Sequence, residues 1–197
     1  MILFWGTSRR NFYDNLVSKR SHASGWHVTA KVAAVTNVFL RQVIEQTGGK
    51  LGDTIAAAIT NTVETMFGQK TYPAQARTAP DPQRNYAAVV TLTQDQSFFK
   101  LRLSFDMNLI KTLVAASYPL EAANSDEILL DAVSEVANVV SARMTSFVNG
   151  NGYNITRDIP VAELGKGDVI AAGSVGLNFS IFRNNLAVKN LLTVSLI

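Results

Sequence analysis

Residues 125–152 read SDEILLDAVSEVANVVSARMTSFVNGNG, the longest helical pattern in the chain. Ser125 or Asn124 can cap the start of a helix, and two acidic residues follow in the first turn, where the helix dipole favours anions. Apolar residues then recur at three- and four-residue spacing as far as Val148, and the Asn-Gly pairs of 149–152 end the pattern. The stretch predicts one long amphipathic helix from about Ser125 to Val148.

The two faces of this helix differ in kind. At 100° per residue the apolar side chains fall in one arc, which must face a core; they are Leu129, Val133, Val136, Val140, Met144 and Phe147. The opposite arc holds short or polar side chains, namely Asp131, Glu135, Asn138, Ala142, Thr145 and Asn149. A solvated face would carry Lys, Arg, Glu and Gln in quantity, so this arc predicts a surface that another molecule can approach closely.

Two β-hairpins are expected around this helix. In the first, strand 86–93 is rich in β-formers, the turn falls at 94–96, and alternating side chains from Phe99 to Phe105 put one face on a core. The second, at 175–196, turns at Asn184-Asn185. We also expect an edge strand at 70–77, a strand near 153–158, and a Gly-rich loop containing Gly165 and Gly167.

Further helices are expected at three places. One spans 28–47 and ends at Gly48-Gly49, one is capped by Asp53-Thr54 and ends at Gly68, and one spans Met107 to Ser117. Runs of hairpins separated by helices predict an α+β fold, with a mainly antiparallel sheet packed against long helices, rather than a doubly wound parallel sheet.

Composition excludes several classes of protein. The 197 residues are 47% hydrophobic and 17% charged, which suits one sizeable domain with an appendage. With no cysteine, a disulfide scaffold, thiolate catalysis, an iron–sulfur cluster and a Cys-type zinc site are excluded. The sequence also lacks a P-loop, a G-x-S-x-G element and a dinucleotide-binding fingerprint.

The net charge of +3 is unevenly distributed. Residues 1–50 hold seven Lys and Arg against two Asp and Glu, whereas 51–197 hold eleven against thirteen. We therefore divide the chain into a basic N-terminal extension, 1–50, with a helix near 28–47, and a folded domain, 51–197. We expect no nucleic-acid partner, no membrane segment and a cytoplasmic location, since no apolar run approaches the ~20 residues of a membrane span.

A short motif within the long helix resembles a known family. Ser134-Glu135-Val136-Ala137-Asn138-Val139-Val140, followed by a Gly-rich turn, a strand and Pro160, resembles the Glu-x-x-Asn signature of the CheX/CheC/FliY chemotaxis phosphatases. The helix that ends at 64–68 and the two hairpins come in the family's order. The resemblance covers about residues 51–197. Because only one Glu-x-x-Asn motif is present, the chain is similar to CheX rather than to two-site CheC. Ala142 departs from the Gly that the family often has four residues after the Asn.

The resemblance implies a CheC-like fold and a hydrolase activity in two-component signalling. The substrate would be the aspartyl phosphate of a CheY-type response-regulator receiver. Asn138 and Glu135 are the candidate catalytic residues: Asn138 would orient the attacking water, and Glu135 would contact a receiver lysine. The receiver would supply Mg²⁺, so no cofactor or metal is expected on this chain. A homodimer formed through a sheet edge is also expected.

Other interpretations stay open. The chain could be a non-catalytic interaction module of the same fold, like a flagellar-switch scaffold that binds a receiver or another protein. It could also be an unrelated α+β binding domain in which Glu-x-x-Asn is a coincidence. Weaker alternatives concern single residues: Asp131 as a second functional carboxylate, Asp126-Glu127 or His22 and His27 as metal ligands, and Arg143 as a partner contact.

Overall fold

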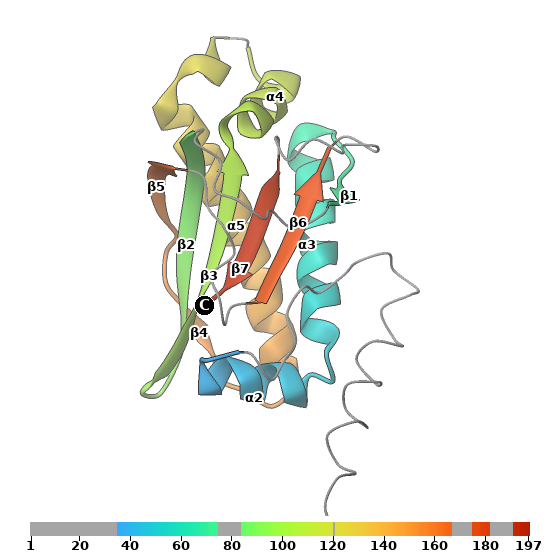
Figure 1. Cartoon of the computed structure of the whole chain (residues 1–197), viewed down its shortest axis with the longest axis vertical. Helices are drawn as coiled ribbons and strands as arrows, with labels where there is room; N and C mark the ends of the chain where they lie inside the picture. Colours follow the sequence, from blue (N-terminus) through green and yellow to red (C-terminus); the bar gives the residue numbers. More distant parts are fainter. Residues whose placement is uncertain (1–34, 75–83, 120, 167–174, 182–190) are drawn as a thin grey trace, which may run out of the picture.

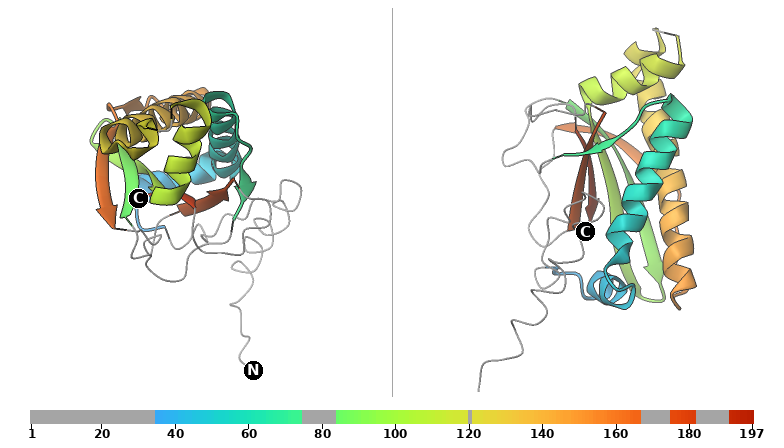
Figure 2. Two further views of the ribbon diagram at one scale, coloured as in Figure 1. Left: turned by 90° about the horizontal axis from the view of Figure 1, so that it is seen from above. Right: turned by 90° about the vertical axis from the view of Figure 1, so that its right-hand side faces the viewer.

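The computed structural model describes residues 35–74, 84–119, 121–166, 175–181 and 191–197. These residues form two layers, a twisted sheet and a layer of helices on one of its faces (Figures 1 and 2). The helices are α2 (Val38–Gln46), α3 (Lys50–Phe67), α4 (Met107–Ser117) and α5 (Asp126–Gly150), with the short 3-10 helix η3 (Ala122–Asn124) before α5. The predicted α+β fold is confirmed.

The sheet has seven strands in the described part of the chain. They are β1 (Tyr72–Pro73), β2 (Arg84–Gln94), β3 (Ser97–Asp106), β4 (Thr156–Arg157), β5 (Val161–Lys166), β6 (Val175–Ser180) and β7 (Leu192–Leu196). Their order is β1-β6-β7-β3-β2-β4, with β5 also paired to β2, and every pairing among them is antiparallel. The prediction of a mainly antiparallel sheet is thus confirmed.

The first hairpin forms where the period-two pattern predicts it. Ala88 pairs with Leu103 and Leu92 pairs with Phe99, so these side chains point to the helices and are buried. The turn between β2 and β3 places Asp95 at φ 53°, a left-handed conformation that Asp tolerates better than most residues. The hairpin forms the centre of the sheet on which the helices pack.

Helix α5 lies along this hairpin, as its apolar arc predicts. Of the six side chains on the predicted apolar arc, Phe147 is half-buried and the other five are fully buried, namely Leu129, Val133, Val136, Val140 and Met144. Ser125 caps the helix by accepting from the backbone N–H of Ile128, and Asp126 accepts a 2.6 Å hydrogen bond from the Tyr86 hydroxyl of β2. The start of α5 is therefore fixed to the sheet.

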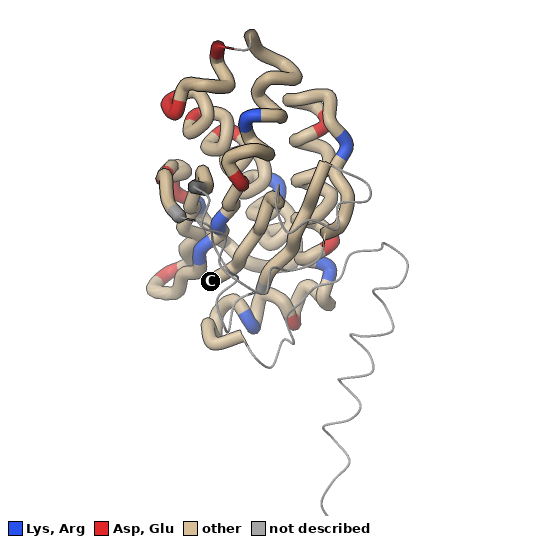
Figure 3. Tube along the Cα trace, turned by 45° about the horizontal axis from the view of Figure 1, so that its top comes forward, with Lys and Arg blue, Asp and Glu red and all other residues tan. Residues whose placement is uncertain are grey.

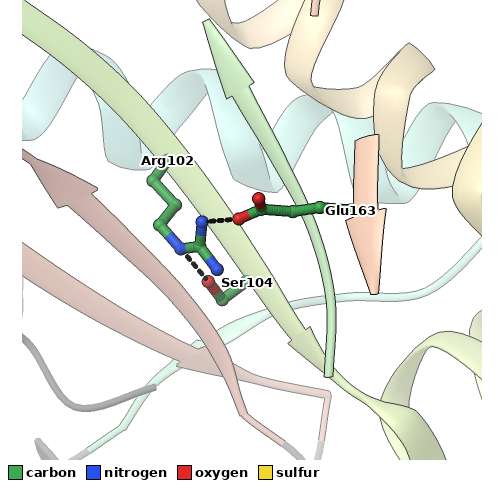
Figure 4. A network of polar contacts seen from close by, with 3 residues as sticks. All are labelled: Arg102, Ser104 and Glu163. Atoms are coloured by element: carbon green, nitrogen blue, oxygen red, sulfur yellow. Dashed lines mark hydrogen bonds and ion pairs between the residues drawn. The ribbon is translucent and has the colours of Figure 1, made fainter. Parts of the chain in front are cut away.

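The opposite face of the sheet carries the polar half of the alternation. Arg102 of β3 forms an ion pair with Glu163 of β5, and its Nε donates to the Ser104 hydroxyl at 3.2 Å (Figure 4). β2 lies between these two strands, so the ion pair connects β3 and β5 across it. The contact helps to hold β5 at the edge of the sheet.

β5 corrects one prediction. We expected a Gly-rich loop around Gly165, but Val161–Lys166 pairs with β2 over six residues. The free edge of β2 supplies backbone partners that outweigh the low strand propensity of glycine. Gly165 lies opposite Asn85, where a Cβ would come within 3.2 Å of Asn85 Oδ1, so a small residue suits the position.

Helix α2 belongs to the same core as the rest of the fold. Leu40, Val43 and Ile44 are buried in that core. The centroid of the Phe39 ring lies 5.7 Å from that of Phe99 and 6.0 Å from that of Tyr153. Burial, with a smaller contribution from the Glu45 carboxylate, raises the pKa of the Tyr153 hydroxyl above its ordinary value. The folded unit thus reaches back at least to Val35, well before the division expected at residue 50.

The next helix also begins earlier than expected. α3 starts at Lys50 after Gly49, whose φ of 76° lets the chain turn directly from α2 into α3. The predicted cap at Asp53-Thr54 lies inside the first turns of this helix. Residues 28–34 and 75–77 and the turn at Asn184-Asn185 lie outside the described residues, and none of the described helices is both long and apolar enough to cross a bilayer.

The burial of α2 gives a test with a matched control in the same helix. Val43 is 0% exposed and Val38 is 62% exposed. Val43→Ala should lower the free energy of unfolding by about 2 kcal/mol, because it removes buried methyl groups and leaves a cavity. Val38→Ala should change it by less than about 0.5 kcal/mol. Chemical denaturation measures both, and equal small effects would show that α2 is an appendage.

Candidate functional site

An open groove of about 420 Å³ runs between α5 and the chain that returns from its C-terminal end. One wall is formed by α5 and the other by residues 157–160, which run from the end of β4 to the start of β5. The lining residues are Asp131, Ser134, Glu135 and Asn138 from α5, and Arg157, Asp158, Ile159 and Pro160 from the facing segment. The groove therefore contains both residues of the Glu-x-x-Asn motif.

The facing segment is held close to α5 by the amide side chain of Asn149. Asn149 Nδ2 donates to the Ile155 carbonyl at 3.0 Å, and its Oδ1 accepts from the Ile155 N–H at 2.7 Å. The Gln94 side chain at the hairpin tip accepts from the Asn154 N–H at 2.9 Å. These bonds turn the chain back along α5 directly after the helix ends.

The chain bulges where it forms the outer wall of the groove. Leu92 of β2 pairs with Arg157, and Val89 pairs with Val161. Residues 158–160 therefore face only two residues of β2, and one residue is in excess. Ile159 lies on this bulge and is 85% exposed, so it places an apolar side chain at the rim of the groove.

Asn138 lies half-buried beneath this segment. Its Oδ1 accepts a hydrogen bond from Arg157 Nη1 at 2.6 Å. Its backbone carbonyl accepts from the Ser141 hydroxyl at 3.0 Å, one turn further along the helix. The hydrogen bond from Arg157 joins the two walls of the groove at Asn138.

Glu135, one turn before Asn138, is exposed. Asp131 and Asp158 are also exposed at the groove, so three carboxylates and one basic side chain, that of Arg157, line it. Elsewhere on the described trace, Lys and Arg are interspersed with Asp and Glu (Figure 3). The charge pattern of the groove suits a partner that brings its own cationic groups.

The structure narrows the prediction of an open face along the whole of α5. Asp131 and Glu135 are exposed, but Asn138 and the residues that follow on this arc are half-buried; these are Ala142, Thr145 and Asn149. The chain that turns back along α5 after Asn149 covers this part of the arc. The approachable surface is therefore the first half of the predicted face, and it ends at Asn138.

The weaker candidates occupy other places. Asp126 accepts from Tyr86 at the start of α5, and Arg143 is an exposed residue that does not line the groove. Within the described residues, no three His, Asp or Glu side chains come together in a way that could hold a metal ion. His22 and His27 lie outside the described residues.

Sequence reasoning missed the outer wall of the groove. Arg157 and Asp158 were placed in a strand without a functional role, and Ile159 was not singled out. No local periodicity marks them, because their place beside α5 is set by the Asn149 bonds and by pairing with β2. The one signal for these residues in the sequence is that they follow soon after the predicted end of the helix that carries the Glu-x-x-Asn motif.

Comparison with known proteins relates this chain to others through its structure. No protein-family model and no curated protein matches the sequence. The structure is similar to that of the chemotaxis protein CheX from Vibrio vulnificus, with 17% identity, a TM-score of 0.59, and coverage of 75% of this chain and 95% of that chain. The fold is thus that of the CheX and CheC-like proteins, and the resemblance inferred from the motif is confirmed at the level of fold.

Two further structures share this fold. The CheX–CheY–BeF₃–Mg²⁺ complex from Borrelia burgdorferi matches with 11% identity and a TM-score of 0.51, over 73% of this chain and 94% of that chain. The middle domain of FliM from H. pylori matches with 11% identity and a TM-score of 0.51, over 77% of this chain and 90% of that chain. The fold therefore occurs both in a CheX protein complexed with CheY and in the middle domain of FliM.

The Asn149 contacts predict a structural role for its half-buried side-chain amide. Asn149→Ala removes both bonds to the buried Ile155 backbone and should lower the free energy of unfolding by about 2 kcal/mol. Asn154→Ala removes an exposed side chain and should change it by less than about 0.5 kcal/mol. Equal unfolding free energies for the two variants would contradict the role of Asn149 in fixing the outer wall.

Proposed function

We propose that this protein belongs to the CheX/CheC/FliY family and hydrolyses the aspartyl phosphate of a CheY-type receiver. The observation that carries the proposal is the position of Glu135 and Asn138 on one groove, at the end of the approachable face of α5. The fold shared with CheX supports it, as does the occurrence of a CheX–CheY complex among the similar structures. Beryllofluoride is a phosphoryl mimic, so that complex suggests the kind of partner state that this groove would meet.

The reaction needs little chemistry from this chain. Water attacks the phosphorus, the bond between phosphorus and the aspartyl oxygen breaks, and the carboxylate leaves while the water loses a proton to phosphate or solvent. The receiver carries Mg²⁺ and charged groups that stabilise the transferred phosphoryl group. What remains to be supplied is a water held in line with the breaking bond. We assign that task to the neutral amide of Asn138.

Glu135 is proposed to fix the register of the two proteins. It is exposed on the turn before Asn138, so a receiver lysine can reach it while the phosphoryl group approaches the amide. A charge pair that loses water on docking contributes to both affinity and orientation. The neighbouring carboxylates of Asp131 and Asp158 add to the attraction for a cationic partner surface. No cofactor on this chain enters the proposal, and its setting would be the cytoplasm, where receivers work.

A second candidate is a non-catalytic interaction module. The similarity to the FliM middle domain favours it, because that domain has the same fold in a protein other than CheX or CheC. Such a module would bind a receiver or another protein through the same groove without releasing phosphate. Measuring phosphate release and receiver affinity on the same samples separates the two candidates.

Substituting the two motif residues tests the catalytic proposal. Asn138→Ala should lower the rate of phosphate release by about 10²-fold through loss of the oriented water, with receiver affinity retained. Glu135→Ala should weaken receiver binding by about 2 kcal/mol or more and lower activity with it. Both rates are measured with a CheY-type receiver phosphorylated by acetyl phosphate, and each variant is checked by thermal melting.

Helix α3 supplies matched controls. Asn61 and Glu64 are exposed at the same three-residue spacing but lie outside the groove. Asn61→Ala and Glu64→Ala should leave activity and binding unchanged. Full activity in Asn138→Ala would remove the water-orienting role. A wild-type protein that binds the receiver without accelerating its dephosphorylation would favour the interaction module.

We also propose that the chain forms a homodimer through a sheet edge. In the described sheet the edges are β1 at one side and β4 with β5 at the other. β5 is the longer, and Val161 at its start is 66% exposed. An edge strand of this kind presents unpaired backbone groups that a second copy can pair with.

Light scattering tests the dimer. At micromolar concentration the measured mass should be about twice that of one chain, and Val161→Lys should shift it toward the monomer because a charge on an edge strand opposes pairing. Val38→Lys, exposed on α2 away from this edge, should leave the mass unchanged. A monomer mass for the wild type would contradict the proposal.

A further inference from the structure

We propose that Arg157 is a positioning residue that fixes the carboxamide of Asn138 with its N–H donors turned toward the groove. The inference rests on the proposed function and adds a residue outside the Glu-x-x-Asn motif. It starts from one contact, the 2.6 Å hydrogen bond from Arg157 Nη1 to Asn138 Oδ1. A bond this short to a guanidinium is charge-assisted and stronger than a bond between neutral groups.

The chemistry of arginine fixes the orientation of the amide. A guanidinium has five N–H donors and no acceptor, so the Asn138 atom that faces it must be the oxygen. The two ends of an isolated amide are nearly equivalent in shape, and rotation about the last side-chain bond would exchange them. With Arg157 in place, the Oδ1 end is held against β4 and the Nδ2 end is directed away from it.

Arg157 is itself well anchored. Its backbone lies in β4 opposite Leu92, and the residues on either side bond to β2 as well. The Asp158 N–H donates to the Thr91 carbonyl at 3.0 Å, and the Thr156 hydroxyl donates to the Thr93 carbonyl at 3.3 Å. The guanidinium therefore extends from a strand whose position is fixed, although the side chain is exposed.

This orientation decides how Asn138 can hold a water. The Nδ2 group has no hydrogen-bond partner among the described residues, so its donors are available to a ligand. A donor N–H engages one lone pair of the water oxygen and leaves the other to attack phosphorus. The positive charge of Arg157 on Oδ1 draws electron density from the amide and strengthens the Nδ2 donors.

The alternative is that Arg157 only stabilises the fold by tying β4 to α5. Both roles predict some loss of stability when the bond is removed, so stability does not separate them. A positioning role predicts in addition that the loss falls on the rate of the chemical step, and that it depends on the presence of the Asn138 amide.

The contact itself is tested without any receiver. In ¹⁵N-labelled protein, the side-chain amide signal of Asn138 is identified by its absence in Asn138→Ala. Arg157→Met keeps an unbranched apolar stem and removes every donor, and it should move this signal. Arg143→Met, an exposed arginine of α5 outside the groove, should leave the signal in place. An unmoved signal in Arg157→Met would overturn the proposal whatever the activity of the protein.

The role is tested by a double-mutant cycle with a phosphorylated CheY-type receiver. Arg157→Met should lower kcat by about tenfold, the scale of a misplaced catalytic group, while affinity for the receiver loaded with beryllofluoride and Mg²⁺ changes by less than about twofold. In the Asn138→Ala background the same substitution should have no further effect on kcat. Arg143→Met should behave as wild type in each measurement.

Three results would overturn the role of Arg157. They are an unchanged kcat in Arg157→Met, a loss that appears only in receiver affinity, and an equal loss of kcat with and without the Asn138 amide. Each of these leaves the proposed function intact if wild type is active and Asn138→Ala is not. A wild-type protein that releases no phosphate above the receiver's own rate overturns the proposed function, and the role of Arg157 falls with it.

Discussion

The burial of one face of α5 against the β2–β3 hairpin fixes the helix on the sheet and, with it, the position of the groove. Val136 and Val140 are buried against that core, and Asn138 lies between them in sequence. Because each residue turns the helix by 100°, burying the valines leaves Asn138 on the opposite side of the helix from them. A rotation of α5 by one residue would move apolar side chains into the groove and the amide toward the core. The packing energy of the helix thus also orients the site.

A second constraint comes from the edge of the sheet beside α5. The chain leaves the helix at its C-terminal end and returns along it, held by Asn149, before it joins β2 as β4. β5 then continues the same edge, but an extra residue between the two strands makes the chain bulge. The bulge leaves room beside α5, whereas with regular pairing the strand would have continued flat along β2. The groove is therefore a product of the strand pairing as much as of the helix.

Sequence patterns predicted the elements whose periodicity is local. The alternation from Phe99 to Phe105 and the apolar arc of α5 each bury a face, so each could be recognised without knowing its partner. β5 was missed because Gly165 lowers its propensity, and only the free edge of β2 makes it a strand. The pattern of α2 showed that one face is buried but not in which core. Arg157 was missed for the same reason, since its contact with Asn138 spans nineteen residues and depends on the return of the chain.

The electrostatics of the groove bear on which substrates the proposed site would accept. The groove is lined by Glu135, Asp131 and Asp158 and by one basic residue, Arg157, whose guanidinium already donates to Asn138. A free phosphate or a small phosphoester would meet more negative than positive charge, and it would bring no cation of its own. A receiver presents its phosphoryl group together with Mg²⁺ and a lysine, so carboxylates that would repel a free anion would attract a receiver surface. Under the proposed function, selectivity for a protein substrate would then follow from the charge of the rim, while the neutral amide at its inner end adds no charge that would oppose the attack of water.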